Sequence, residues 1–339
     1  MSSGAPPILT RARDLVGPAL RAAVDSLSSA SMRRVAGYHF GWLTADGTPV
    51  EGGGGKYVRP ALVLLCAEAV GGAAAEAVPG GVAVELVHNF SLLHDDLLDR
   101  DEERHHRRTA WTVFGPAQAI LAGDALLTLA EQVLVEVPGE AARQALRHLN
   151  DATQELIGGQ ADDVSFEERM DVTLDEVLAM VHGKTGALIG SAAAIGAVLG
   201  GAGDEQVAAL GEFGTRIGLA FQLVDDLLGI WGRPEVTGKP VLADLRSRKK
   251  SLPVVYALTA GDDSSERLAA LLASDGWRDE EEVELAAKLV EDAGGRDWTQ
   301  REAHRQLELA AQSLDRAGAA PAARAELLDL ARFITDRER

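Results

Sequence analysis

The sequence predicts an all-α protein, and three observations support this fold class. Apolar residues recur with helical spacing along most of the chain, and Gly, Pro and capping residues separate these runs. No segment alternates β-branched and polar residues as a half-buried strand would. The 339 residues, 46% of them hydrophobic, can bury a large core. We therefore expect a single helical domain over residues 8–339, preceded by a loose tail over residues 1–7.

Helix boundaries are marked most clearly in the middle of the chain. Gly115-Pro116 opens an apolar helical run, and Pro138-Gly139 closes it. Thr173 and Glu176 have the spacing of a capping box, at the head of a segment that stops near Gly200-Gly201. Each of these runs is bounded on both sides, so two long helices are predicted.

A second capping pair, Thr299 and Glu302, predicts the start of the C-terminal helices. The apolar run over residues 186–202 is rich in Gly and Ala and short for a membrane span. We expect it to be a buried core helix, and we expect no transmembrane segment. The short Gly/Pro clusters between residues 60 and 253 are flanked by helical patterns, which favours one domain over two.

The formal net charge of −19 argues against nucleic acid and anionic membranes as partners, because both would repel such a surface. An anionic substrate would need local positive charge. The single cysteine, Cys66, allows no disulfide within the chain and is typical of a reducing compartment. Residues 1–7 do not have the features of a secretory signal, so a cytoplasmic location is expected.

Two related acidic motifs are the strongest functional signal, Asp95-Asp96-Leu97-Leu98-Asp99 and Asp225-Asp226-Leu227-Leu228-Gly229. An isolated Asp-Asp pair is usually a solvated helix end, but apolar runs precede both motifs and predict buried helices. Residues four apart share a helix face, so Asp95 and Asp99 can reach one cation. Magnesium prefers such oxygen ligands and commonly binds together with substrate phosphates. A polyphosphate substrate is therefore predicted.

Basic residues gather near these motifs in a chain that is otherwise acidic. Each alone is more often a solvated surface residue, but together they predict a pocket that binds diphosphate through side-chain donors and metal ions. Lys56 and Arg59 are three apart, hence adjacent if they share a helical turn that Pro60 helps to start. The full set is Lys56, Arg59, Arg104, Arg107, Arg108, Lys184, Lys239, Lys249 and Lys250.

Six motifs in order resemble the trans-prenyl diphosphate synthase family, the polyprenyl synthetases that include farnesyl and geranylgeranyl diphosphate synthases. They are Gly-Lys-x-x-Arg-Pro, His-Asp-Asp-x-x-Asp, Ala-Gly-Asp-Ala-Leu-Leu, Gly-Lys-Thr-Gly, Phe-Gln-x-x-Asp-Asp and Thr-Gly-Lys-Pro, spread over residues 52–258. The resemblance implies a helical bundle around a deep central cavity, with the acidic motifs facing each other across its mouth. It also implies a homodimer.

The resemblance further implies roles for individual residues. Asp95, Asp96, Asp99, Asp225 and Asp226 match residues that hold magnesium, about three ions bound with the substrate diphosphate. The residues that match the grip on the allylic diphosphate are Arg104, Lys184 and Lys239. Those that match polar neighbours of the developing cation are Thr185 and Gln222. Those that match the isopentenyl diphosphate site are Lys56, Arg59 and His88.

Three residues depart from the family pattern. His105 stands where a second arginine would contact isopentenyl diphosphate, Tyr57 replaces a commonly basic residue, and Gly229 replaces the last aspartate of the second motif. These departures keep two alternatives open, a terpene synthase that cyclises an allylic diphosphate and a non-catalytic subunit of a heteromeric synthase. An aromatic content of 4% argues against a cyclase, which commonly lines its pocket with aromatic faces. The intact first motif argues against a non-catalytic subunit.

Two further expectations come from the resemblance. Product length is set in this family by side chains one or two helical turns before the first acidic motif. Phe90 is followed there by the small Ser91, so a single aromatic floor and a geranylgeranyl diphosphate product are expected. The alternative is that Phe90 only packs on a neighbouring helix. Residues 38–42 resemble a segment of members packaged in protein shells through long tails, but the tail of this chain is short.

Overall fold

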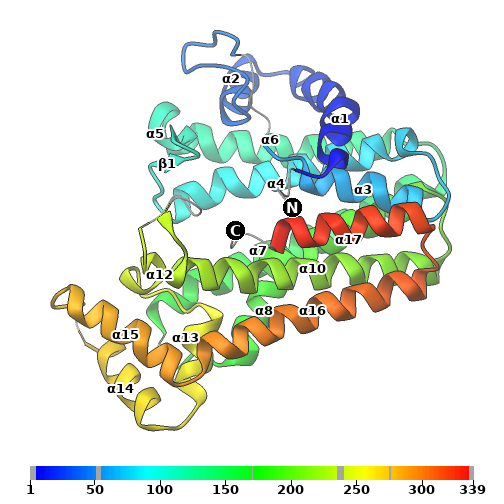
Figure 1. Ribbon diagram of the computed structural model, residues 1–339. Helices are drawn as coiled ribbons and strands as arrows, with labels where there is room; N and C mark the ends of the chain where they lie inside the picture. The colour runs from blue at the N-terminus through cyan, green and yellow to red at the C-terminus, as the bar shows by residue number, and fades with distance from the viewer. Residues whose placement is uncertain (1–4, 51–54, 170, 235–239, 275, 336–339) are drawn as a thin grey trace. The chain divides into compact units, whose positions relative to one another are not determined.

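The computed structural model describes residues 5–50, 55–169, 171–234, 240–274 and 276–335 (Figure 1). Within these residues the chain is helical almost throughout, which confirms the predicted all-α class. The elements of the first part of the chain are α1 (Pro7–Asp25), α2 (Ala30–His39), α3 (Val58–Ala69), η1 (Ala74–Ala77), α4 (Val78–Leu98), β1 (Glu103–Arg104), β2 (Arg107–Arg108), α5 (Ala110–Phe114) and α6 (Pro116–Val135).

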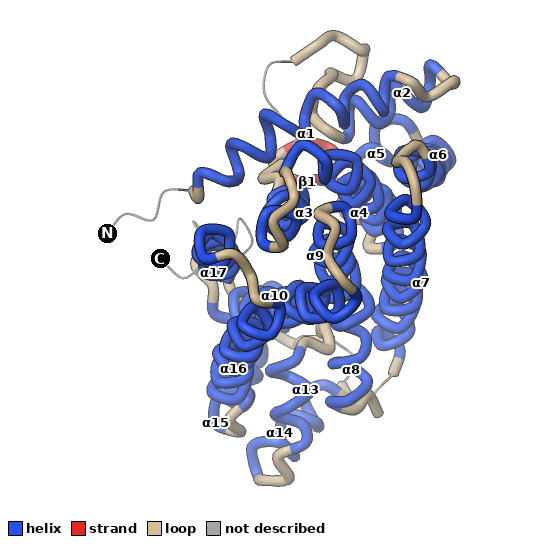
Figure 2. Tube along the Cα trace, turned by 90° about the vertical axis from the view of Figure 1, so that its right-hand side faces the viewer, coloured by secondary structure: helices blue, strands red, loops and turns tan. Residues whose placement is uncertain are grey.

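The remaining elements are all helical. They are α7 (Glu140–Glu168), α8 (Leu174–Val181), η2 (His182–Gly186), α9 (Ala187–Leu199), α10 (Asp204–Trp231), α12 (Ala243–Arg246), α13 (Leu252–Thr259), α14 (Asp263–Leu272), α15 (Glu280–Asp292), α16 (Gly295–Ala317) and α17 (Pro321–Thr335). Figure 2 shows the longer of these helices, among them α7, α10 and α16, joined to their neighbours by loops.

The chain divides into two compact units, and each carries one acidic motif. Unit 1 contains residues 1–153, 191–211 and 314–330, and unit 2 contains residues 154–190, 212–313 and 331–339. The boundaries fall inside the helices α7, α9, α10, α16 and α17. The single domain expected from the sequence stays a prediction.

Unit 1 is organised around α4, which packs along α6 and contacts α1 and α3. Its inward residues from Val82 to Val87 are almost fully inaccessible to solvent. Gly80 and Gly81 let neighbouring helices approach, since a β-carbon at Gly80 would lie 2.6 Å from a methyl group of Ile195. This burial holds the first acidic motif at the far end of a rigid helix.

In unit 2 the helices α13, α14 and α15 form a small cluster, and α13 also contacts α8 (Figure 1). Its core joins Ile230 at the end of α10 to Leu245 of α12 and Val254 of α13. A second core places Val177 and Val181 of α8 with other apolar side chains of the unit. The end of α10, which carries the second acidic motif, is thereby held by packing.

Several boundary predictions are confirmed. The helix α6 starts at Pro116 and ends before Pro138-Gly139. Thr173 caps α8 through a capping box with Glu176. The run over 187–199 is buried, with Ala192, Ala193 and Ile195 fully inaccessible, as expected of a core helix.

By length and composition alone, three segments among the described residues are apolar enough to cross a membrane, Pro116–Val135, Leu174–Leu199 and Asp204–Trp231. The hydrophobic window in Leu174–Leu199 is 72% buried inside the protein.

Two local predictions are wrong. Thr299 does not start a helix, because α16 already begins at Gly295 and the Thr299 hydroxyl donates a hydrogen bond to the Gly295 carbonyl at 2.8 Å. Lys56 and Arg59 do not share a helical turn, since α3 begins at Val58, after Lys56. Tyr57 precedes α3 with φ of 54°, and this left-handed conformation separates the two cations.

Candidate active site

The first acidic motif lies at the C-terminal end of α4. The Asp99 amide donates a hydrogen bond to the Asp95 carbonyl at 2.8 Å, so the two residues are one helical turn apart, as predicted. Asp95 is half-buried and Asp99 is exposed. Carboxylates are unfavourable at a helix C-terminus, where the backbone carbonyls already concentrate negative potential. A cation at this end of α4 would relieve that repulsion.

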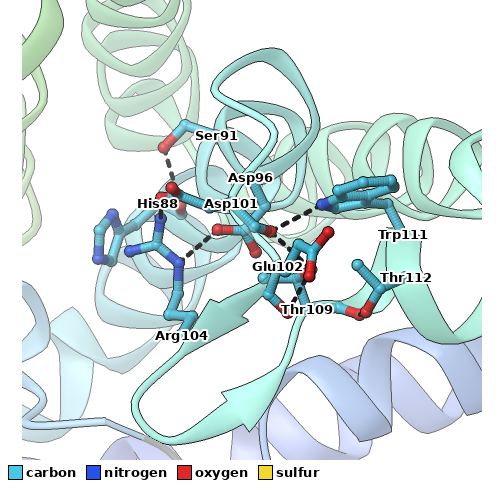
Figure 3. Close-up of polar contacts among 9 residues, drawn as sticks. All are labelled: His88, Ser91, Asp96, Asp101, Glu102, Arg104, Thr109, Trp111 and Thr112. Carbon is cyan, nitrogen blue, oxygen red and sulfur yellow. Dashed lines mark hydrogen bonds and ion pairs between the residues drawn. The ribbon is translucent and has the colours of Figure 1, made fainter. Parts of the chain in front are cut away.

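Asp96 is bound by Arg104 rather than by its neighbours in the motif (Figure 3). Asp96 is only 1% exposed, and one carboxylate oxygen accepts a hydrogen bond from Arg104 Nε at 2.6 Å. Burial raises the pKa of Asp96, and the Arg104 charge opposes that shift. The other oxygen, Oδ2, is buried and has no hydrogen-bond partner among the described residues. This oxygen is therefore suited to a metal ion or an ordered water.

Arg104 is carried by a short hairpin that an all-helical prediction did not include. The strands β1 and β2 pair Arg104 with Arg107, and the turn between them consists of His105 and His106 with φ of 51° and 60°. Positive φ at both positions is typical of tight two-residue hairpins. Asp101 fixes the base of the hairpin, since its carbonyl accepts hydrogen bonds from Thr109 and the Trp111 indole (Figure 3).

Arg107 and Arg108 serve the structure of the hairpin. Arg107 donates to the Tyr38 carbonyl at 3.1 Å and to the Leu43 carbonyl at 3.3 Å, and its guanidinium stacks over the Tyr38 ring at 4.6 Å. Arg108 donates to the Thr112 carbonyl at 3.0 Å. Within the segment 104–108, Arg104 is thus the arginine that reaches the first acidic motif.

His105 is exposed at the tip of the hairpin and lies near Lys56. Partial burial, then the charges of Arg104 and Lys56, lower its pKa. His105 is therefore neutral near pH 7 in the free protein. For His105 to bind a diphosphate as a cation, the bound anion must restore its charge.

Arg59 lies in the first turn of α3, and the charge of the buried Glu85 carboxylate acts on it. Burial raises the pKa of Glu85 to about 6, against the opposing influence of Arg59 and a hydrogen bond from Asn89. The Asn89 amide donates to the Glu85 carbonyl at 2.8 Å and to its carboxylate at 3.3 Å. Arg59 Nε is buried without a partner in the described residues, so the guanidinium keeps donor capacity for a ligand.

His88 and His39 are held neutral in the same part of unit 1. Burial, followed by the charges of Arg59, His39 and Arg104, places the pKa of His88 well below its usual value. For His39, burial and the Arg104 charge lower the pKa to about 3, although a hydrogen bond with Asn89 opposes the shift. Neutral imidazoles here leave Arg59 and Arg104 as the fixed positive charges of the cluster.

The His39 shift has a measurable effect on stability. In the unfolded chain His39 binds a proton once the pH falls below its usual pKa of 6.5, whereas in the folded protein it does so only near pH 3. The free energy of unfolding therefore decreases as the pH falls from 6.5 toward 3. Between pH 7 and pH 5 this loss is roughly 1–2 kcal/mol. We expect urea unfolding at the two pH values to show a larger drop for the wild type than for His39→Gln. Equal drops would contradict the assignment, because other titrating groups are common to both proteins.

Tyr57 is part of the core, not of the diphosphate-binding surface. It is 4% exposed, and its hydroxyl lies against Gly17 of α1, 3.3 Å from where a β-carbon would be. Arg13 stacks over the ring at 5.9 Å. Its departure from the family pattern therefore has a packing explanation, because α1 leaves room at Gly17 for this ring.

The second acidic motif lies near the C-terminal end of α10 in unit 2. Asp226 is 2% exposed and accepts hydrogen bonds from Gln222 Nε2 and from the Leu252 amide, both at 2.9 Å. Lys249 Nζ lies 3.7 Å from the same carboxylate. Burial raises the pKa of Asp226 to about 6, although Lys249 and the Leu252 amide favour the charged form. Asp225, its neighbour, is half-buried.

Lys184 lies on the π-helical turn η2, between α8 and α9. Its ammonium donates to Asp163 Oδ2 at 2.5 Å. Gly159 and Gly183 allow α7 and η2 to touch through their backbones, since a β-carbon at Gly159 would lie 2.4 Å from the Lys184 amide nitrogen. Such π turns are frequent at functional sites because they redirect side chains within a helix.

Thr185 and Gln222, which the family resemblance implies to be polar neighbours of the developing cation, contact each other. The Thr185 hydroxyl donates to Gln222 Oε1 at 3.1 Å, and the Gln222 amide donates to Asp226. The chain Thr185–Gln222–Asp226 orients both polar groups. Lys239, the remaining predicted ligand of the diphosphate, lies outside the described residues.

The described residues contain no group of three or more His, Cys, Asp or Glu side chains already gathered as a metal site. The donors nevertheless suit magnesium, which takes carboxylate oxygens and usually completes its shell with substrate phosphates and water. The unpartnered oxygen of Asp96 and the acidic end of α4 fit such an open site.

Phe90 is buried one turn before the first motif, with its ring against the edge of His94 at a centroid distance of 4.8 Å. His94 in turn contacts α6, where its Nε2 lies 3.0 Å from the Ile120 carbonyl. A β-carbon at Gly123 would lie 2.3 Å from the same nitrogen. His94 therefore supports the Phe90 ring from the side of α6.

Sequence reasoning missed Asp163 and Glu85 as neighbours of the predicted cations, and Asn89 as the partner of Glu85. Asp163 had a signal, because it follows a double glycine and ends a Gln-Ala-Asp-Asp run. Glu85 and Asn89 had a weaker signal, two polar residues four apart on one helix.

Comparison with known proteins agrees with this arrangement. The polyprenyl synthetase family model matches residues 42–290. The chain is 51% identical over 335 residues to (2E,6E)-farnesyl diphosphate synthase from Mycobacterium tuberculosis, covering 98% of this chain and 93% of the relative. It is 44% identical over 332 residues to geranylgeranyl diphosphate synthase from the same organism, with the same coverage.

Among solved structures, polyprenyl synthetase from Streptomyces coelicolor A3(2) has a TM-score of 0.92 and 53% sequence identity, covering 97% of this chain and 98% of that one. Geranylgeranyl pyrophosphate synthetase from Pyrococcus horikoshii Ot3 has a TM-score of 0.87 at 32% identity, covering 98% and 99%. The range matched by the family model includes both acidic motifs. The chain therefore belongs to the polyprenyl synthetase family and is a prenyl-transferring enzyme.

Proposed function

We propose that the enzyme ionises an allylic isoprenoid diphosphate and transfers its prenyl group to isopentenyl diphosphate. The observation that carries this proposal is the cluster of basic side chains near the first acidic motif, in which Arg59 and Arg104 carry the fixed charges. Arg104 binds Asp96, His105 lies near Arg104 and Lys56, and the charges of Arg59 and Arg104 both act on His88. A cyclase that ionises one diphosphate has no need of a second set of diphosphate donors.

In this proposal Asp95, Asp96, Asp99, Asp225 and Asp226 hold magnesium with the allylic diphosphate. When bound, magnesium supplies positive charge that stabilises the departing diphosphate. Arg104 and Lys184, with Lys239, donate hydrogen bonds to the same leaving group. Arg104 is already paired with Asp96, and Lys184 with Asp163, so at these two residues binding exchanges a carboxylate for the diphosphate.

The bond changes balance without a dedicated protein base. The carbon–oxygen bond of the allylic substrate breaks, and both electrons leave with the diphosphate. Thr185 and Gln222 direct their dipoles toward the allylic cation, and their mutual hydrogen bond limits their rotation. The double bond of isopentenyl diphosphate, held by Lys56, Arg59 and His88, attacks the cation. The released diphosphate accepts the proton that restores a double bond.

The product is proposed to be geranylgeranyl diphosphate, on the basis of Phe90 as a single aromatic floor with Ser91 beside it. The Mycobacterium tuberculosis relatives include both a farnesyl and a geranylgeranyl diphosphate synthase, so farnesyl diphosphate is the other product to be assayed. The enzyme is also proposed to act as a cytoplasmic homodimer. Exposed apolar residues on α6, including Leu121 at 52% exposure, support self-association.

The test is incubation with geranyl, farnesyl and geranylgeranyl diphosphates, each with and without isopentenyl diphosphate, followed by separate analysis of diphosphates and hydrocarbons. Longer diphosphates formed only with isopentenyl diphosphate support the proposal. Hydrocarbons or alcohols formed without it would identify a cyclase, and no turnover of any substrate would indicate a non-catalytic subunit.

Replacing His105 with arginine is expected to lower the Michaelis constant for isopentenyl diphosphate by about tenfold, because a permanent charge replaces a neutral imidazole. The Michaelis constant for the allylic substrate should change little. His106→Arg is the matched control, since it makes the same change at the adjacent turn position, which also has positive φ. Equal effects of the two substitutions would show that overall charge, not a contact at His105, is responsible.

A further inference from the structure

Gly229 occupies the last position of the second acidic motif, and a side chain has no room there. An ideal β-carbon at Gly229 would lie 2.2 Å from Oδ2 and 2.4 Å from Cγ of Asp244. Asp244 belongs to α12 and is 8% exposed. A carboxylate on a short, buried side chain cannot move far, so glycine at 229 is what lets Asp244 approach α10.

The turn that carries Asp244 also carries Lys249. The Lys249 amide donates to the Asp244 carbonyl at 2.9 Å, and the Ser247 hydroxyl donates to the same carbonyl at 3.1 Å. Leu242 begins this segment with φ of 64°. These bonds close the segment into one unit, and Lys249 Nζ extends from it to within 3.7 Å of the Asp226 carboxylate.

We propose that Asp244 is a positioning residue of the second acidic motif: its carboxylate fills the space over Gly229. The main-chain hydrogen bond between Lys249 and Asp244 belongs to the same turn, from which Lys249 reaches Asp226. The carboxylate missing from position 229 of α10 is thus supplied by α12. This inference rests on the proposed function for its kinetic consequences, but the contact itself does not.

The contact is tested by a thermal unfolding cycle with Gly229→Ala, Asp244→Ala and the double variant. In a helix, Gly→Ala normally stabilises. Gly229→Ala should instead lower the melting temperature when Asp244 is present, and raise it in the Asp244→Ala background, because the clash is gone. A stabilising or neutral Gly229→Ala in the wild-type background would overturn the proposed contact.

The electrostatic role is tested with Asp244→Asn, which keeps the shape of the side chain and removes its charge. We expect the magnesium concentration for half-maximal stabilisation by inorganic pyrophosphate, measured by thermal shift, to rise by about tenfold. Half-saturation of diphosphate release by magnesium should rise in parallel. Asp263→Asn, an exposed aspartate in the first turn of α14, is the matched control and should change neither value. Unchanged magnesium dependence in Asp244→Asn would overturn the positioning role.

A transfer of the carboxylate gives a third readout. The double variant Gly229→Asp, Asp244→Ala places an aspartate on α10 in the vacated space. Its magnesium affinity should be at least tenfold higher than that of Asp244→Ala. No recovery in a folded double variant would contradict the proposal. If the wild type released no diphosphate from any allylic substrate, the proposed function would fail. The melting-temperature and pyrophosphate measurements would still decide between Asp244 as a positioning residue and Asp244 as a packing residue.

Discussion

Asp95→Ala is expected to reduce release of diphosphate from the allylic substrate by about a thousandfold or more, the largest effect among the predicted variants. Asp95 lies at the acidic end of α4, one turn before Asp99. The Asp96 carboxylate already uses one of its oxygens to accept from Arg104. Loss of Asp95 would therefore leave the magnesium site incomplete at the point where charge accumulates.

The measurement is the steady-state rate of diphosphate release at saturating magnesium, together with the melting temperature. Asp95 is half-buried at a helix end where its charge is unfavourable, so the variant should fold with unchanged or higher stability. Glu136→Ala, which removes an exposed carboxylate at the C-cap of α6, is the matched control and should be fully active. Near-normal turnover of Asp95→Ala, or of the wild type in excess EDTA, would rule out the proposed metal mechanism.

Phe90→Ala is expected to change the main product to one that is at least one isoprene unit longer. The Phe90 ring is buried one turn before the acidic motif, and it is supported by His94. Removing it would leave a volume next to α4 that the growing prenyl tail could occupy. Because the chemistry takes place at the acidic motif, diphosphate release should continue at a comparable rate.

The variant must be shown to be folded, because truncation of a buried phenylalanine costs ~3–5 kcal/mol. Phe213→Ala removes a fully buried phenylalanine of α10 and is the matched control for this loss of stability. The product distribution is measured by chromatography of the dephosphorylated prenyl alcohols. A folded, active Phe90→Ala enzyme with an unchanged product would show that Phe90 only packs against His94 and α6.

The amino-acid sequence was sufficient to predict the helical class and the residues of the two acidic motifs. Helical periodicity and capping residues are local signals, and they placed α6 and the start of α8 correctly. The i to i+4 relation between Asp95 and Asp99 is equally local, because it follows from helix geometry alone. Thr299 shows the limit of such signals, since its hydroxyl bonds within a helix that had already begun at Gly295.

Most partners of the predicted residues could not be found from sequence, because they come from segments far apart along the chain. Lys184 pairs with Asp163, Asp226 is contacted by Lys249 and the Leu252 amide, and no spacing rule connects these positions. Gln222 is the exception, because it lies four residues before Asp226 on the same helix. Pairwise contacts of this kind arise only when helices pack. The same holds for Arg107, which by sequence is one of several basic residues and by structure binds the backbone at Tyr38 and Leu43.

The departures from the family pattern show most clearly what the sequence determines and what the tertiary structure determines. From the sequence alone, Tyr57 and Gly229 stand where the family pattern has a basic residue and an aspartate, so a charged group is missing at each position. The tertiary structure places the Tyr57 ring against Gly17 of α1 and the Asp244 carboxylate against Gly229. Residue identity, periodicity and motif order are properties of the chain, and they determined the family and the candidate chemistry. Which side chain fills which space depends on packing between distant segments, so only the folded protein decided that both substitutions have a close-fitting neighbour.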